Sequence, residues 1–322
     1  MDALSDVLKA IRVEGAVFIN AEFTAPWCIW SSFGQAEISE RLRAERLLFF
    51  HFLLEGSCKL RVGNESFEAQ EGDLVLFSRG ERHLMGSDLQ LAPVDAMSIP
   101  AEAASPTGDF FQVRYGGSGP ATRFVCGYIA CNDLACRPLL DALPTAVCLR
   151  VCDGGPTSLV REMLRVAVRE SLALRPGAES TLAKISELLF VEAMRRYVNI
   201  LPHDRKGWLA GLRDPKVAQA LALLHCEPRR EWTVDTLASE VALSRSALAK
   251  RFTSLVGESP MQYLLRWRLA LAADMLRSTA EPIARVALRN GYDSEESFIR
   301  AFKRNFGMPP ATWRRSGAMV AA

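Results

Sequence analysis

The stretch TVDTLASEVALSRSALAKRFTSLVGESPMQY, residues 233–263, decides the fold because a second version of it, PIARVALRNGYDSEESFIRAFKRNFGMPPATW, occupies residues 282–313. The first apolar positions of the two copies are 49 residues apart, whereas the positions from Ser244 and Ser294 onward are 50 apart. The second copy therefore has one extra residue in its centre. Solenoids and propellers need at least about three stacked units, so two copies predict a pair of equivalent sites instead.

Each copy has the pattern of a helix, a tight turn and a second helix. In the first copy, Thr233 can cap a helix with one apolar face, and its turn is expected around Ala242. Ser244 can cap the following helix, which carries Leu248 and Phe252 on one side.

In the second copy, Gly291 is expected to form the turn, because glycine tolerates positive φ. Asp293 and Glu296 have the spacing of a capping box and predict the start of the second helix. Two such units in succession are typical of helix-turn-helix structure.

The outward faces of the second helices are candidate DNA contacts. Since Leu248 and Phe252 must face inward, the other side of their helix faces out, and the same holds in the second copy. The major groove accepts such a face near a helix N-terminus. A single helical Arg or Lys is more often only solvated, but repetition of the whole unit favours a DNA contact. The outward residues are Arg245, Ser246, Ala249, Lys250, Glu295, Glu296, Arg300 and Lys303.

Residues 208–316 resemble the DNA-binding domain of the AraC/XylS family of bacterial transcription regulators, most closely in IARVALRNGYDSEESFIRAFKRNFGMPPATWR, residues 283–314. The resemblance implies that Asp214 caps and Pro215 opens the first helix, and that a long helix around residues 267–276 joins the two units. Ala249 departs from the longer polar side chain that is common at its position. The positions that would face bases are Ser246, Ala249, Lys250, Glu295, Glu296 and Arg300.

Charge and composition support two different parts. Residues 207–322 contain 17 Lys and Arg against 11 Asp and Glu, whereas the other 206 residues contain 22 against 26. A basic part gains affinity for DNA from phosphate contacts and counterion release. With 322 residues, 49% of them hydrophobic, the chain can build two cores. We expect a soluble cytoplasmic protein without a signal peptide or membrane partner, whose eight cysteines are free thiols.

The N-terminal part is predicted to be β structure up to about residue 150, with turns at Gly63-Asn64 and Gly72-Asp73. RLLFFHFLL, residues 46–54, is a buried strand in this interpretation. GDLVLFSRGERH, residues 72–83, resembles the second motif of cupins, with Gly72, Gly80 and His83 at the expected spacing. The resemblance implies a cupin-like sensor barrel, and the whole chain is then an α+β protein.

This barrel is predicted to hold no metal and no other cofactor. Metal cupins use two His and a Glu of the first motif together with the second-motif His. The first-motif positions fall near Arg43, Glu45 and Phe49, so only His83 is left. His51 lies off the motif spacing, and each of these histidines is expected to be a hydrogen-bonded core residue.

A small-molecule effector is predicted to bind inside the barrel, because apolar interiors with few polar groups are the usual ligand sites. The helical domain is expected to offer no comparable cavity. The candidate lining residues are Phe50, Phe52, Leu74, Leu76 and His83.

The cysteines leave an alternative open. Cys126, Cys131 and Cys136 recur every fifth residue, which is not the CxxC spacing of zinc sites. Cys126 and Cys131 are candidate thiols for sensing oxidants or electrophiles. Cys126 in RFVCGYI also fits a core position of a strand.

The predicted organisation is a cupin-like sensor domain (1–152), a helical dimerisation segment and linker (153–206) and a DNA-binding domain (207–322). Residues 157–173 and 179–198 are amphipathic helices in this scheme. The function it predicts is transcription regulation by a homodimer that binds promoter DNA, a small-molecule effector and RNA polymerase, with activation or repression left open. A thiol-based sensor is the alternative. A cupin enzyme is less favoured, because the metal ligands are missing.

Overall fold

The structure is a computed structural model that describes residues 3–10, 18–31, 46–104, 110–131, 137–150, 162, 165–166, 177–202 and 205–318. Contacts divide the chain into two compact units. One comprises Arg12–Asn132 and Leu143–Tyr197, and the other comprises Met1–Ile11, Asp133–Ala142 and Val198–Ala322. The first is the β unit and the second is the helical unit. The three-part division predicted from the sequence stays a prediction.

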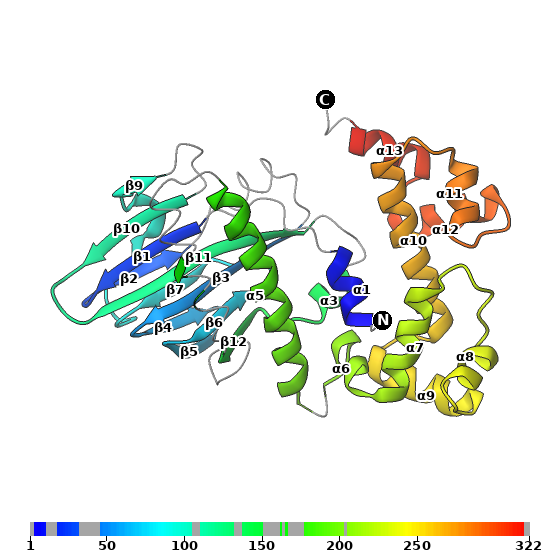
Figure 1. Cartoon of the computed structure of the whole chain (residues 1–322), viewed down its shortest axis with the longest axis horizontal. Helices are drawn as coiled ribbons and strands as arrows, with labels where there is room; N and C mark the ends of the chain where they lie inside the picture. The colour runs from blue at the N-terminus through cyan, green and yellow to red at the C-terminus, as the bar shows by residue number, and fades with distance from the viewer. Residues whose placement is uncertain are drawn as a thin grey trace. The chain divides into compact units, whose positions relative to one another are not determined.

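The β unit consists of two sheets (Figure 1). Among the described residues, one sheet has the strand order β12-β6-β3-β11-β1-β10-β9 and the other has the order β5-β4-β7-β2-β8. The strands are β1 (Phe18–Thr24), β2 (Cys28–Ser31), β3 (Arg46–Glu55), β4 (Ser57–Val62), β5 (Glu65–Gln70), β6 (Asp73–Phe77), β7 (His83–Gly86), β8 (Val94–Asp95), β9 (Ala103–Ala104), β10 (Phe110–Gly116), β11 (Ala121–Cys131) and β12 (Ala146–Arg150), and a 3₁₀ helix spans Ala96–Ser98.

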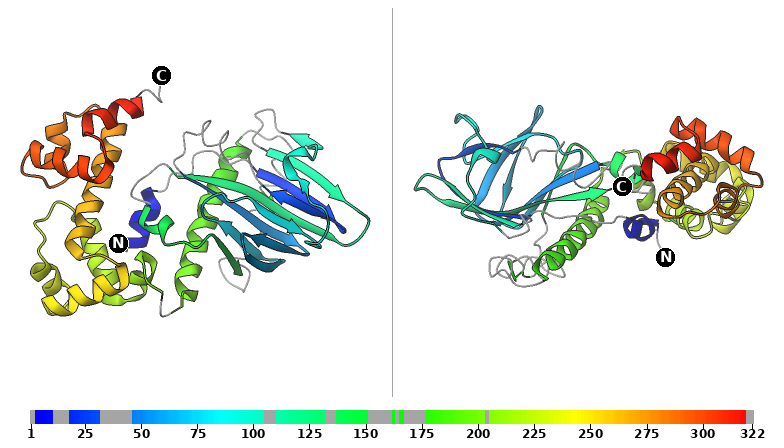
Figure 2. Two further views of the ribbon diagram at one scale, coloured as in Figure 1. Left: turned by 180° about the vertical axis from the view of Figure 1, so that it is seen from behind. Right: turned by 90° about the horizontal axis from the view of Figure 1, so that it is seen from above.

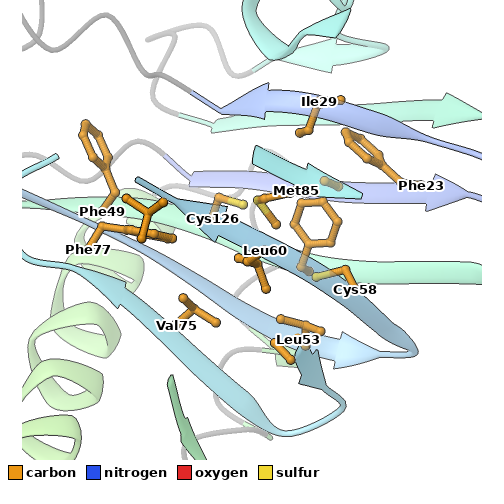
Figure 3. Packing of buried hydrophobic residues seen from close by; sticks show 14 of the residues in the cluster. Phe23, Ile29, Phe49, Leu53, Cys58, Leu60, Val75, Phe77, Met85 and Cys126 are labelled. Atoms are coloured by element: carbon orange, nitrogen blue, oxygen red, sulfur yellow. The ribbon is translucent and has the colours of Figure 1, made fainter. Parts of the chain in front are cut away.

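Strand β3 is the predicted buried strand, and it has a paired strand on each side. It pairs with β11 and with β6, so that His51 lies opposite Cys126 on one neighbour and Val75 on the other. Side chains alternate between the faces of a strand. The odd-numbered residues of β3 therefore face the interior cluster of the β unit, and Figure 3 shows Phe49 and Leu53 there together with Cys126.

The opposite face of β3 and β6 is also buried. Phe50, Phe52, Leu74 and Leu76 are each at most 1% exposed, yet they do not belong to the interior cluster. Helix α5 (Ala178–Ile200) lies beside this sheet in Figures 1 and 2. Its amphipathic pattern was predicted over residues 179–198, whereas the other predicted helix, residues 157–173, lies almost entirely outside the described residues.

The helical unit contains two short helices from the N-terminal part of the chain. α1 (Ala3–Ala10) packs against α7, and α3 (Arg137–Asp141) packs against α6. Neither was predicted, because their partners lie far away in the sequence. The remaining helices are α6 (Trp208–Arg213), α7 (Pro215–Cys226), α8 (Val234–Glu240), α9 (Arg245–Val256), α10 (Pro260–Ser278), α11 (Ile283–Arg289), α12 (Glu295–Phe306) and α13 (Pro310–Ala318).

The predicted caps of the first copy are confirmed. Asp214 accepts hydrogen bonds from two backbone amides at the start of α7, with Pro215 as the first helical residue. Thr233 forms a capping box with Thr236 at α8, and the Ser244 hydroxyl accepts from the Ala247 amide at α9. Each cap satisfies amides that would otherwise lack partners in the first helical turn.

The two turns are equivalent residue by residue. Ala242 (φ 54°) and Gly291 (φ 75°) both have left-handed backbone conformations. The amide that follows each turn residue bonds back to the preceding helix, over 2.9 Å in the first copy and 3.1 Å in the second. The 49-residue offset thus continues through the turn, and the extra residue of the second copy comes just after it.

One predicted cap is wrong. Asp293 does not cap α12, because the cap is Ser294, whose hydroxyl accepts from the Ser297 amide over 3.2 Å. Asp293 is the inserted residue, and it precedes the cap. Asp and Ser are both good N-caps, so composition alone did not decide between neighbouring positions.

Candidate functional site

Helix α9 presents the predicted contact face of the first unit. Leu248 and Phe252 are fully buried, which fixes the rotation of the helix about its axis. Arg245, Ser246 and Lys250 are consequently exposed, and Ala249, named in the same prediction, is half-buried. The N-terminal turn of α9 is therefore free to approach a nucleic acid.

Helix α12 repeats this arrangement. Phe298 and Phe302 are fully buried against α10 and α13 as part of one apolar cluster. The four predicted residues of this helix, Glu295, Glu296, Arg300 and Lys303, are all exposed. The two glutamates lie in the first turn, where negative charge is favourable towards the helix dipole.

Three of these cations are available to phosphate or base edges. Lys250, Arg300 and Lys303 form no ion pair with any described carboxylate. Arg245 lies 3.3 Å from Asp235, with both side chains more than 60% exposed. Such an exposed pair contributes little, about 0–1 kcal/mol, and can open when DNA competes for the guanidinium.

Helix α10 joins the two helix-turn-helix copies as a single continuous helix, as predicted. Figure 1 shows α9 and α12 towards opposite ends of it. Its 19 residues correspond to about 28 Å at about 1.5 Å per residue. Successive major grooves on one side of the duplex are about 34 Å apart, so the length of α10 suits two neighbouring grooves.

Arg268 of α10 ties the segment that precedes the first helix-turn-helix copy to the turn of the second copy. Its guanidinium donates to the carbonyl of Pro228 over 2.6 Å and of Arg230 over 2.9 Å, and to the carbonyl of the turn residue Gly291 over 3.3 Å. A rigid planar donor that holds three carbonyls fixes the relative position of the two halves.

A buried aromatic network joins α10 to α6 and α7, the helices that precede the first copy. Tyr263 accepts a hydrogen bond from the Trp208 indole over 2.8 Å, and the His225 ring lies 2.6 Å from the Tyr263 hydroxyl. The same imidazole stacks on Trp267, with ring centroids 3.9 Å apart. Burial lowers the pKa of His225 to about 3, so it is neutral at physiological pH.

A second group of polar side chains lies inside the β unit. Cys126 Sγ lies 2.6 Å from His51 Nδ1, and His51 Nε2 lies 2.7 Å from His83 Nε2. The second nitrogen of His83, Nδ1, lies 2.9 Å from the carbonyl oxygen of Glu81. All three side chains of this Cys126–His51–His83 array are at most 3% exposed.

The carbonyl at one end fixes every proton in the array. A carbonyl only accepts, so Nδ1 of His83 carries the proton, and its Nε2 is an acceptor when the ring is neutral. His51 must then donate from Nε2 and accept at Nδ1. The Cys126 thiol is consequently the donor to His51, and the array is a continuous path from sulfur to the carbonyl.

Burial keeps the array neutral. Desolvation, and to a smaller extent His83, lower the pKa of His51 well below its usual value, and desolvation lowers that of His83 to about 4. Desolvation also raises the pKa of Cys126 well above its ordinary value. At neutral pH the resting state is therefore a thiol hydrogen-bonded to a neutral imidazole.

The array borders a small apolar cavity in the β unit. Its volume is about 50 Å³, whereas sites for drug-sized ligands measure about 300–1,000 Å³. His51, Cys126 and Ser31 are the polar side chains of its wall. The other lining residues are Ile19, Ala21, Phe23, Ile29, Met85, Ala96, Met97, Val113 and Phe124.

The predicted effector residues are not brought together at this cavity. Phe50, Phe52, Leu74 and Leu76 lie on the opposite face of their strands, and His83 reaches the cavity wall only through His51. The expectation that the helical domain offers no comparable cavity is wrong. A cavity of about 180 Å³ lies in the helical unit, lined by Arg137, Pro138, Asp141, Tyr263, Arg266, Trp267, Ala270, Asn305 and Phe306.

The structure describes the side chain of only one of the two redox candidates. Cys126 lies in the array, whereas the side chain of Cys131 is outside the described residues. Both histidines are hydrogen-bonded core residues, as expected, but their contact with each other and with Cys126 was missed. That contact depends on the register of β3 with β11, strands separated by more than 60 residues, and no local pattern in the sequence specifies it.

No three His, Cys, Asp or Glu side chains within the described ranges are arranged to hold a metal ion. In the same ranges, no helix combines the length and apolar character that crossing a membrane requires.

The fold and the exposed helix faces define a DNA-binding regulator with a β-rich N-terminal domain, and comparison with known proteins agrees. Residues 2–199 match a family model described as Cupin, and residues 237–316 match one described as Helix-turn-helix domain. The chain is 34% identical over 322 residues to a putative AraC-like transcription regulator of Streptomyces lividans, covering 99% of this chain and all of that protein.

Other relatives extend over equally much of the chain. A putative AraC-like transcription regulator of Streptomyces antibioticus is 33% identical, and the HTH-type transcriptional regulator AlkR of Acinetobacter baylyi is 30% identical, each covering 98% of this chain and 99% of the relative. The chain therefore belongs to the AraC family of transcription regulators, with an N-terminal cupin domain and a C-terminal helix-turn-helix domain. These relatives are regulators and not enzymes, and the cupin-enzyme alternative is set aside.

Proposed function

We propose that one chain reads an asymmetric promoter site with α9 and α12 in successive major grooves, and that the N-terminal domain changes this binding in response to a chemical signal. The observation that carries the proposal is the pair of equivalent exposed faces joined by the unbroken helix α10. A rigid connection fixes the spacing of the two half-sites at about 10 base pairs.

Side-chain chemistry assigns different tasks to the exposed residues. Lys250 and Arg300 suit guanine edges, and Glu295 or Glu296 suits the cytosine amino group or the helix dipole alone. Arg245, at the first position of α9, suits a phosphate. Ala249 can contact a thymine methyl group.

The experiment is sequence-preference profiling of single variants of the full chain. Lys250→Ala and Arg300→Ala should each weaken binding by about 1–3 kcal/mol and relax preference in different halves of the site, whereas Arg245→Ala should weaken binding evenly across sequences. Arg251→Ala is the matched control, since this arginine of α9 bonds instead to Asp214 over 2.5 Å and should leave the preference unchanged.

Two outcomes would contradict the two-groove proposal. One is a shift of preference in the same half-site for both Lys250→Ala and Arg300→Ala. The other is unchanged affinity after insertion of about 5 base pairs, half a helical turn, between the halves of the site. A flexible connection tolerates that insertion, and a continuous helix does not.

We also propose that the regulator acts as a homodimer through its helical segment, residues 153–206, and contacts RNA polymerase. Two apolar side chains of α5 support the first part, because Leu188 is 40% exposed and Ile200 is 61% exposed. Burying such side chains against a second copy is favourable. The family resemblance supports the second part.

The size of the cavity in the β unit restricts the kind of signal that can enter it. A metabolite of ordinary size does not fit the 50 Å³ cavity of the β unit. A small-molecule effector at that place would therefore require the cavity to open, whereas a reagent of a few atoms needs no rearrangement.

A further inference from the structure

We infer that Cys126 is a modification site, at which a small hydroperoxide oxidises the thiol to a sulfenic acid and thereby supplies the signal. The inference rests on the proposed function, in which the N-terminal domain changes DNA binding. It assigns that signal to the Cys126–His51–His83 array and to a chemical class of reagent.

The array supplies a proton acceptor for the buried thiol of Cys126. A thiol reacts as its thiolate, and burial opposes ionisation of Cys126. His51 Nδ1, only 2.6 Å from the sulfur, is an acceptor that can take the proton as the reaction proceeds. His83 accepts from Nε2 of His51, and the Glu81 carbonyl holds His83 in the required tautomer.

Oxidation of the thiol to a sulfenic acid needs hydrogen peroxide as its only co-reactant. The sulfur of Cys126 attacks one oxygen of hydrogen peroxide, an S–O bond forms and the O–O bond breaks. The thiol proton moves to His51 Nδ1 and then to the departing hydroxide, which leaves as water. Sulfur loses two electrons and the peroxide gains them, and Cys126 becomes a sulfenic acid.

The cavity selects the size of the reagent. Its volume of about 50 Å³ is far below that of sites for drug-sized ligands, about 300–1,000 Å³, so it suits a reagent of few atoms. Hydrogen peroxide is only slightly larger than water, and its hydroxyl groups can hydrogen-bond to the polar side chains of the wall, His51, Ser31 and Cys126. Cumene hydroperoxide, which carries a phenyl ring and two methyl groups, has many more heavy atoms and should be excluded.

The geometry favours this reagent over a metal ion. The two nitrogens of His51 point in different directions, one to Cys126 and the other to His83. The sulfur and the His83 nitrogen therefore do not converge on one point with a nitrogen of His51, as tetrahedral or trigonal coordination requires.

Oxidation should change the packing around the array. The new hydroxyl lies among apolar side chains of the interior cluster, where a polar group without a partner is unfavourable. Cys126 is on β11 and His51 on β3, so the added atom separates two adjacent strands that the native register pairs closely.

The test is oxidation of the full chain by hydrogen peroxide, with dimedone trapping and mass spectrometry to locate the sulfenic acid. Trapping should occur at Cys126 and be lost in Cys126→Ser. Cumene hydroperoxide at the same concentration should modify Cys126 at least about tenfold more slowly, whereas the exposed Cys226 should not discriminate in this way. Cys58→Ser is the matched control, because Cys58 is a buried thiol of the same cluster without a histidine partner in the described structure.

The pH profile separates proton transfer from a merely structural role. Because the proton passes to His51, the Cys126 rate should change little between pH 6.5 and 8.5, while a free thiol gains about tenfold per unit below its pKa. The other titratable side chains of the interior cluster and its rim are His83, Cys58, Tyr128, Tyr115 and Cys148. His51→Gln should slow trapping at least about tenfold and restore the ordinary rise with pH.

The outcomes distinguish this inference from the proposed function. Promoter affinity of the reduced protein tests DNA binding, and its change on peroxide treatment, by at least about threefold, tests the signal. DNA binding without modification of Cys126 overturns the inference alone. Uptake of about one equivalent of Zn²⁺ or Cu⁺ per chain, lost in His83→Ala, overturns it in favour of a metal site, and unchanged promoter affinity after complete Cys126 oxidation also overturns it.

Discussion

Substitution of the turn residue Gly291 by alanine should destabilise the second helix-turn-helix unit. Gly291 has φ +75°, a backbone conformation that residues other than glycine adopt at a cost of about 1–2 kcal/mol. An added Cβ would also lie 2.9 Å from Cζ of Arg268. The guanidinium that bonds to the Pro228, Arg230 and Gly291 carbonyls must then shift.

The magnitude follows from three contributions. Backbone strain lowers the free energy of unfolding by about 1–2 kcal/mol. Alanine also lowers the conformational entropy of the unfolded chain, which raises the free energy of unfolding by about 0.4–1 kcal/mol. Displacing the partly exposed Arg268 from one of its three carbonyls adds about 1.5 kcal/mol, at the lower end for a charged hydrogen bond. The expected net loss is about 2 kcal/mol.

Amide hydrogen exchange of the full chain measures this loss locally. Peptides from α11 and α12 should exchange about 30-fold faster in Gly291→Ala, because each 1.4 kcal/mol corresponds to about tenfold. Two further variants separate the causes. Gly291→Asn relieves part of the strain and keeps the Arg268 clash, so it should fall in between. Ala242→Gly relieves the strain of the equivalent turn (φ 54°) and should slow exchange in α8 and α9 by about twofold to fivefold.

Two results would refute the reasoning. Exchange in α11 and α12 that stays within about threefold of the parent in Gly291→Ala would mean that neither strain nor the Arg268 contact matters. Equal effects of Gly291→Ala in the parent and in an Arg268→Ala background would show that the clash contributes nothing.

Two other predictions concern acid stability and assembly. His83 and His225 have folded pKa values of about 4 and about 3, below the unfolded value near 6.5, so their stabilisation is complete above pH 6.5 and is lost as pH falls. From pH 7 to pH 5, each histidine should lower the free energy of unfolding by about 2 kcal/mol. Urea titrations of the full chain should therefore show a smaller pH dependence for His225→Phe than for the parent. If the exposed α5 residue Leu188 lies in a dimer interface, Leu188→Glu should shift the sedimenting species from dimer to monomer. A parent that is monomeric at micromolar concentration would refute that assignment.

The helical unit was largely predictable because its signals are local. Caps such as Thr233 and Ser244 and the spacing of Leu248 and Phe252 act within a few residues, and the structure confirms them. The one capping error, Asp293 in place of Ser294, concerned two adjacent residues of similar capping ability. Helices α1 and α3 went unpredicted because their partners in this unit are distant in the sequence.

The contents of the β unit were less predictable because they depend on pairing between distant strands. The sequence indicates that β3 is buried, but which residues share a face with Cys126 follows from the register with β11. Four apolar residues chosen for the cavity therefore lie on the far side of their strands, and the contact of His51 with Cys126 went unnoticed.

The sharing of α10 by both copies means that the repeat is not modular. Its N-terminal half carries Tyr263, which bonds to Trp208 and His225 of the helices before the first copy. Its C-terminal half accepts hydrogen bonds from Trp313 at the Ala273 carbonyl and from Arg314 at the Leu276 carbonyl. A cut at any residue between the copies would leave one half of this helix with its apolar side in water. The two copies of the sequence therefore make one indivisible folding unit, and exchange of a single copy between relatives should succeed only when α10 is exchanged with it.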